Sequence, residues 1–176
     1  MRAFKFLRDD MRSGEGTEPP WEIGKKRTVK GKIILCERGY HSSPTWYDAL
    51  NYAQGNVATL VEVSKPVQKD STKSVSRSCT VIEAQNIEHE LRNWACDCAE
   101  RALKKAKVTD EQSWNAIKVA RLFNVGKATK EELAAAGTAA RDAAWDAAWD
   151  AARAAEVDWQ KKHLDELINP LFKELK

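Results

Sequence analysis

A long stretch without a strong helix breaker, between Thr129 and Pro170, places the tightest limit on the fold. One straight helix over residues 130–168 would be about 58 Å long at a rise of about 1.5 Å per residue. A compact protein of 176 residues is only about 40 Å across, judging from its expected radius of gyration. We therefore expect either a break near Gly137 or a helix that projects and packs against a partner.

The same stretch has two distinct faces. At about 100° per residue, Trp145, Trp149 and Trp159 fall within an arc of about 80°, and alanines occupy the opposite face. Aspartates flank the tryptophans at positions 142, 146 and 150. We expect the alanine face to pack inside a bundle and the three tryptophans to form a homodimer interface. A second layer of the same chain, or a groove for a ligand or host protein, are the alternatives.

The two halves of the chain differ in composition. Residues 1–88 contain six of the eight glycines and four of the five prolines, whereas alanine dominates residues 89–176. Short β-branched runs come first and helical periodicity follows. The sequence predicts an α+β fold, with a small mixed α/β sheet module over residues 1–85 and an α-helical bundle over residues 86–176.

The first half predicts a small set of strands around one short helix. We expect strands at Ala3–Leu7, Lys32–Cys36, 56–63 and Ser78–Ala84, with a loop at 12–24 and a mobile connection at 65–77. Ser43 is a suitable helix N-cap, Pro44 suits the first helical position, and Gly55 suits the residue after the helix.

The second half predicts helices with clear start signals. We expect a helix from near Asn86 to about Lys107. Capping boxes at Thr109–Gln112 and Thr129–Glu132 then mark the starts of two further helices.

The turn at Glu37–Ser42, just before the short helix, is the candidate ligand site. Backbone N–H groups at a helix start favour an anion, and the hydroxyls of Ser42 and Ser43 add donors. Arg38 adds positive charge, His41 can donate to a phosphate or ribose oxygen, and Trp46 can stack on a base. The alternative is that Ser43 only caps the helix and His41 is a hydrogen-bonded turn residue.

The four cysteines, at positions 36, 79, 96 and 98, predict reduced thiols in the cytoplasm and neither a metal nor a cofactor. Cys96 and Cys98 are two residues apart on a predicted helix and point about 200° from each other, so they do not readily bind one ion. No apolar run approaches the roughly 20 residues of a membrane span. The net charge of +3 disfavours a general nucleic-acid binder.

Two family resemblances follow from these residues. The pattern carried by Lys5, Cys36, Gly39, His41 and Val61–Val63 resembles an uncharacterised domain family of phages and prophages, over roughly the first 85 residues. From WACDCAERAL onward, over most of residues 92–165, the chain is similar to an alanine-rich helical domain of immunity proteins. These resemblances imply a phage or prophage accessory protein and imply no mechanism.

A third resemblance concerns the order strand, G-x-H, helix, strand. This order resembles ADP-ribosyltransferase-like folds, where a glutamate on a later strand helps to orient the ribose. Glu62 is the matching acid in this chain. Lys5 stands where those folds carry an arginine, and their E-x-E and S-T-S motifs are missing.

We therefore expect a phage or prophage binding protein that interferes with host defence in the bacterial cytoplasm. It would sequester an anionic nucleotide-type signal or occlude a host defence protein. An ADP-ribosyltransferase-like enzyme is one alternative, and a nucleic-acid binder using Lys25–Arg27 and Lys30–Lys32 is another. The expected ligand-binding residues are Lys5, Arg38, His41, Ser42, Ser43, Trp46 and Glu62.

Overall fold

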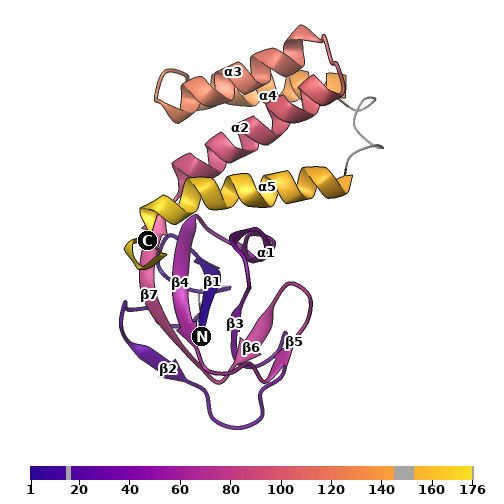
Figure 1. Ribbon diagram of the computed structural model, residues 1–176. Helices are drawn as coiled ribbons and strands as arrows, with labels where there is room; N and C mark the ends of the chain where they lie inside the picture. The colour runs from indigo at the N-terminus through magenta and orange to yellow at the C-terminus, as the bar shows by residue number, and fades with distance from the viewer. Residues whose placement is uncertain (15–16, 145–152, 176) are drawn as a thin grey trace. The chain divides into compact units, whose positions relative to one another are not determined.

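The structure, a computed structural model, describes residues 1–14, 17–144 and 153–175. It has an antiparallel sheet region followed by helices, so the predicted α+β class is confirmed (Figure 1). The chain forms two compact units: the first comprises Met1–Glu88 together with Leu164–Lys176, and the second comprises His89–His163. The chain therefore leaves the first unit, builds the second and returns.

The first unit contains a four-stranded antiparallel sheet. Its order is β1 (Arg2–Leu7), β4 (Val57–Val63), β7 (Ser78–Asn86) and β2 (Lys26–Thr28). Strands β1, β4 and β7 match three of the predicted strands. The edge strand β2 was not predicted, because three polar residues carry no alternating hydrophobic pattern.

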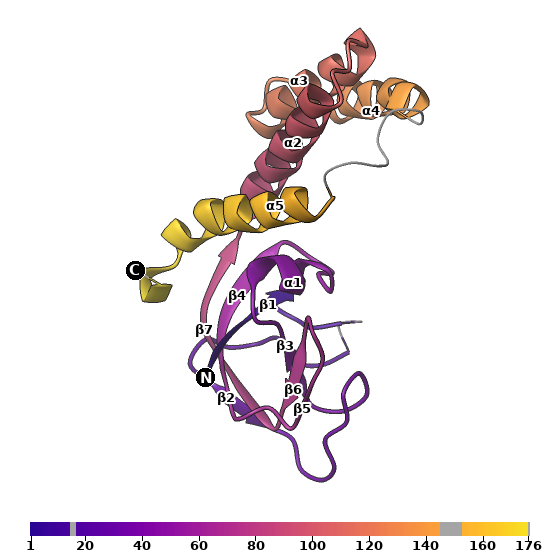
Figure 2. The same cartoon turned by 45° about the vertical axis from the view of Figure 1, so that its right-hand side comes forward.

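A smaller sheet contains β3 (Tyr40–Ser42), β6 (Ser74–Ser76) and β5 (Gln68–Lys69), in that order. The two sheets are joined at two places. Phe4 and Ser43 exchange both backbone hydrogen bonds, at 3.0 and 2.8 Å, and β6 continues into β7 through one residue. The predicted connection at 65–77 is therefore mostly a β-hairpin, which both views show (Figures 1 and 2).

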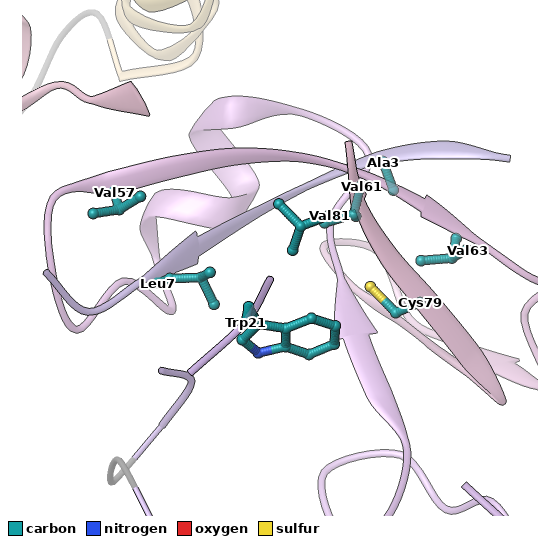
Figure 3. Packing of buried hydrophobic residues seen from close by; sticks show 8 residues of the cluster. All are labelled: Ala3, Leu7, Trp21, Val57, Val61, Val63, Cys79 and Val81. Carbon is teal, nitrogen blue, oxygen red and sulfur yellow. The ribbon is translucent and has the colours of Figure 1, made fainter. Parts of the chain in front are cut away.

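Both faces of strand β1 are covered by apolar side chains. Ala3 and Leu7 of β1 belong to a cluster around Trp21 (Figure 3), which we call the Trp21 cluster. Its other members are Val57, Val61, Val63, Cys79 and Val81. Phe4 and Phe6, on the opposite face of β1, lie against Trp46, with ring centroids 4.3 and 6.2 Å away.

Lys32–Cys36 does not form the predicted strand. Ile34 pairs only with Arg38, through a single antiparallel bridge, so the chain turns back within five residues. Cys36 adopts a left-handed conformation with φ of 67°, which no strand residue has. Gly39, with φ of 133°, completes the turn, and a Cβ there would lie 2.4 Å from Val75. The predicted strand is wrong because the prediction rested only on the hydrophobicity of this run.

The short helix α1 (Trp46–Leu50) begins later than predicted. Thr45, rather than Ser43, is its N-cap, and the Thr45 Oγ1 accepts the Asp48 N–H at 3.0 Å. Ser43 is unavailable as a cap because its backbone pairs with Phe4. Gly55 has a different role from the predicted helix end: a Cβ there would lie 2.5 Å from the Arg8 Cα.

The helices are α2 (Glu88–Lys105), α3 (Glu111–Asn124), α4 (Lys130–Ala144) and α5 (Arg153–Ile168). The capping box before α4 is confirmed by reciprocal bonds of 3.1 and 2.7 Å between Thr129 and Glu132. The cap before α3 is one residue later than predicted, because Asp110 accepts the Ser113 N–H at 2.7 Å.

Helix α4 continues through Gly137, so of the two expected alternatives the break at this residue does not occur, and residues 145–152 lie outside the described residues. One glycine costs a helix only about 1 kcal/mol relative to alanine, and the neighbouring alanines are strong helix formers. Two 3₁₀ turns, Asn169–Leu171 and Lys173–Leu175, follow α5. Among the described residues, no helix is both long and apolar enough to cross a membrane.

Candidate functional site

A groove of about 380 Å³ lies in the first unit beside β2. We call it the basic groove. Its lining residues are Lys26, Thr28, Ser64, Lys65, Val67, Arg77 and Ser78. Three of these seven residues are cations, three are hydroxyl-bearing, and none is acidic, so the groove suits an anion.

Strand alternation places the β2 side chains of the groove. Lys26 and Thr28 both line it, whereas Arg27, between them, packs over the Trp21 ring at 4.1 Å. Arg27 also faces Glu18, with 3.4 Å between Nη1 and Oε2. Thus Arg27, the β2 cation that has a carboxylate partner among the described residues, points away from the groove.

Hydrogen bonds between side chains and the backbone hold the opposite wall of the groove. The Ser64 Oγ accepts the Ser78 N–H at 3.2 Å, and the Ser76 hydroxyl donates to the Ser64 carbonyl at 2.9 Å. The Arg77 Nη1 donates to the carbonyls of Val29 and Gly31, at 3.2 and 3.0 Å. These acceptors are neutral, so they orient the guanidinium without cancelling its charge. Among the described residues, Lys26, Lys65 and Arg77 form no ion pair.

Arg38, a predicted ligand residue, lies beside the same loop. Its Nη2 donates to the Lys30 carbonyl at 2.8 Å, next to the Gly31 carbonyl that Arg77 binds. Two guanidinium groups therefore bind successive carbonyls of one loop. The Arg38 guanidinium is therefore bound to this loop, and Arg38 is not among the residues that line the basic groove.

His41 is held within its turn. Its Nε2 accepts the Cys36 N–H at 2.8 Å. Burial lowers the pKa of His41, and the charges of Lys5 and Lys73 lower it further, against a backbone hydrogen bond with Gly39 that raises it. A neutral ring fits its observed role as an acceptor. This geometry matches the alternative in which His41 is a hydrogen-bonded turn residue.

Trp46 cannot stack on a ligand base in this structure, contrary to its predicted role. Its side chain is 1% exposed and packs against Phe172, with 5.0 Å between ring centroids. The Trp46 Nε1 also donates to the Asn169 Oδ1 at 3.0 Å. Trp46 is a core residue because three other aromatic rings surround it.

Lys5 and Glu62 lie on opposite faces of the sheet. Lys5 is opposite Thr59 in the β1–β4 register, and Glu62 is three residues further along β4. An odd spacing reverses the side-chain direction. Within the described residues, no hydrogen bond or ion pair joins Glu62 to Lys5, Arg38 or His41. The predicted ligand set therefore does not form one site.

The sequence interpretation missed the wall of the groove that comes from residues 64–78. Its signal was present: residues 65–77 contain four basic side chains, at positions 65, 69, 73 and 77, and one acidic side chain. The β-hairpin that orients them was mistaken for a loop because its strands have only two and three residues.

The second unit holds the predicted interface residue Trp159. Its ring stacks on His163, with centroids 4.7 Å apart, and the Arg101 guanidinium lies 4.4 Å from its centroid. Trp159 therefore has partners within its own chain. Trp145 and Trp149 lie outside the described residues, so the homodimer stays a prediction.

All four cysteines are free thiols. Burial raises the pKa of Cys79 to about 11, and burial together with the neighbouring Glu156 and Asp97 raises that of Cys98 to about 11. In the described part of the chain, no group of three or more His, Cys, Asp or Glu side chains could hold a metal ion.

Comparison with protein families identifies the first half of the chain. The family described as "Domain of unknown function (DUF7666)" matches residues 1–93. The chain belongs to this family. The DUF7666 match includes all seven strands, α1 and the whole basic groove, and it ends within α2. The prediction of an uncharacterised domain family is confirmed to that extent. No curated protein and no solved structure matches the chain.

Proposed function

We propose that this DUF7666 protein is a non-catalytic binding protein that holds a phosphate-bearing, nucleotide-type anion in the basic groove. The observation that carries the proposal is a groove of about 380 Å³ with three cations and no acid. Small-molecule sites commonly have volumes of about 300–1,000 Å³.

The lining chemistry favours phosphate. Lysine and arginine bind phosphate oxygens through charge-assisted hydrogen bonds, and hydroxyl groups add neutral donors. Arg77 is held in place by loop carbonyls before a ligand arrives, so less side-chain entropy is lost on binding. Val67, 51% exposed, offers an apolar surface to a sugar or base.

The biological role we propose is interference with host defence by a phage or prophage protein in the bacterial cytoplasm. Sequestering a nucleotide signal needs binding without turnover, which an open groove of cations can provide. The role rests on the family resemblance of the sequence and on the chemistry of the groove. The separation of Lys5 from Glu62 does not favour the ADP-ribosyltransferase alternative.

Titration of fluorescently labelled ATP, GTP and cyclic dinucleotides into the full chain tests the proposal. Lys65→Met should weaken binding about tenfold, the expected loss for one charge-assisted contact. Lys69→Met is the matched control, because Lys69 is exposed on the same hairpin and outside the groove lining. Equal affinity of the Lys65→Met variant and the unmodified chain would overturn the proposal.

The same titration separates a nucleotide from a nucleic acid. If the ligand is a nucleotide, an unlabelled nucleotide should displace the labelled nucleotide as well as a ten-base oligonucleotide does at equal phosphate concentration. A much stronger oligonucleotide, with a steep loss of affinity in salt, would instead indicate a nucleic-acid binder and contradict the proposal.

A further inference from the structure

One strand position that faces the Trp21 cluster carries a charged side chain, Lys5 of β1. Ala3, Lys5 and Leu7 alternate with Phe4 and Phe6, and their β4 partners are Val61, Thr59 and Val57. Ala3 and Leu7 belong to the Trp21 cluster (Figure 3). Because every second residue of a strand faces the same side, Lys5 points into this cluster as well.

The Lys5 ammonium has no partner in the described part of this cluster. Among the described residues, it forms no hydrogen bond or ion pair. The nearby Glu18 is already occupied, since its Oε1 accepts from the Ser13 N–H and the Trp21 Nε1, both at 2.8 Å. Its Oε2 faces Arg27 at 3.4 Å. Cys79 supplies no negative charge, because burial raises the pKa of its thiol to about 11.

Ser42 adds an unpaired hydroxyl beside Lys5. The paired residues Phe4 and Ser43 make Ser42 the cross-strand neighbour of Lys5. Ser42 is only 4% exposed, and its Oγ has no hydrogen-bond partner within the described residues. The Thr59 hydroxyl is not free for this role, because it donates to the Lys5 carbonyl at 2.7 Å.

We propose that Lys5 and Ser42 bind a small monovalent anion of halide size inside the Trp21 cluster. A charge in apolar surroundings is costly unless it is paired, and a buried hydroxyl is costly unless it is bonded. One anion satisfies both groups. The close-packed apolar neighbours Leu7 and Val81 favour a halide over a hydrated phosphate. Lys5 remains partly exposed, which gives an ion a route from solvent.

This site differs from the basic groove, because the two share no residue. Burial also lowers the pKa of Lys5, against smaller raising effects from the nearby Cys79 and Glu18. An anion bound there stabilises the charged form.

Thermal unfolding of the full chain in sodium bromide and in sodium gluconate, at equal ionic strength, tests the proposal. Bromide well above its dissociation constant should raise the Tm by about 2–4 °C over gluconate, which is too large to enter. Lys5→Met should abolish this difference and Ser42→Ala should reduce it. Lys65→Met, which changes only the basic groove, should retain it.

A second measurement does not depend on variants that fold. The native chain should broaden the bromine-81 resonance of bromide, and chloride should reverse the broadening. Equal unfolding in both salts, or a bromide effect that survives Lys5→Met, would contradict the proposal.

Discussion

The two units of the chain are stabilised by different interactions. The first unit buries large apolar side chains almost completely, including Leu7, Leu60 and Trp46 at 1% exposure or less. In the second unit, few of the described side chains are buried, and most of those are small. They are Cys96, Ser113, Ile117 and Ala136. Half-exposed ion pairs connect its helices instead. The first unit therefore depends on apolar packing, and the second depends on solvent conditions.

Two carboxylates connect α2 and α5 in the second unit. Asp97 of α2 binds the His163 Nε2 at 2.7 Å, and it also binds the Arg121 Nη2 at 2.8 Å. Glu156 of α5 binds the Arg101 Nε at 3.0 Å and also pairs with Lys105. Such pairs contribute little individually when they are exposed, so a network of them is easier to weaken than a packed core.

The largest expected effect is in the first unit. Trp46→Ala should lower the free energy of unfolding by about 3–5 kcal/mol, because it leaves a cavity among Phe4, Phe6 and Phe172. Hydrogen exchange followed by mass spectrometry should show faster exchange in β4. Tyr52→Ala is the control, since Tyr52 is 46% exposed. An unchanged exchange rate in β4 would contradict the packing described for Trp46.

A smaller effect is expected from Asp97→Asn. It weakens two charged hydrogen bonds and should destabilise the second unit by about 1–2 kcal/mol, measured by hydrogen exchange in α3. Burial alone would raise the pKa of Asp97, but hydrogen bonds from His163 and Arg121 outweigh it and lower the pKa. The contribution of Asp97 is therefore present above about pH 4 and lost as pH falls through this lowered pKa.

The comparison of variant and unmodified chain at low pH completes that experiment. Below the lowered pKa of Asp97, the two chains should have equal exchange in α3. Asp158→Asn, a substitution at an exposed residue of α5, should have little effect at any pH. A deficit that persists at low pH would mean that packing, rather than charge, explains Asp97→Asn.

Raising the salt concentration should lower the stability of the second unit relative to that of the first by less than about 1 kcal/mol. Raising sodium gluconate from 0.05 to 1 M shortens the screening length from more than 10 Å to about 3 Å. Exchange in α2 and α3 should therefore accelerate relative to exchange in β4 and β7. Equal changes in both units would show that the ion pairs of the second unit contribute no more than those of the first.

The cysteines report the same difference without changing stability. Cys79 of the first unit is 1% exposed, Cys98 of the second is half-buried, and the pKa of each is raised to about 11. Alkylation by iodoacetamide at pH 8, read by mass spectrometry, should modify Cys98 at a lower urea concentration than Cys79. The reverse order would contradict the greater stability of the first unit.

Hydrophobic alternation and capping signals predicted part of the fold. Strand β4 and the Thr129 capping box were predicted because their signals are local. The strand at Lys32–Cys36 failed because pairing depends on a distant partner, which an apolar run does not reveal. The basic residues of 65–77 are visible in the sequence, but the groove is not, for the same reason: Lys26 and Lys65 are far apart in the chain and meet only through the sheet.

The return of the chain to the first unit has a consequence for biosynthesis. Phe172 and Leu164 are completely buried there, and the Arg2 side chain binds Glu174. A ribosome makes residues 89–163 before it makes Leu164, Phe172 and Glu174. Throughout that interval Trp46 and the β1 phenylalanines lack part of their cover, so the nascent strands expose aromatic surface. Chaperones that bind exposed aromatics would have their best opportunity during this delay, and a pause in translation within the second unit would prolong it.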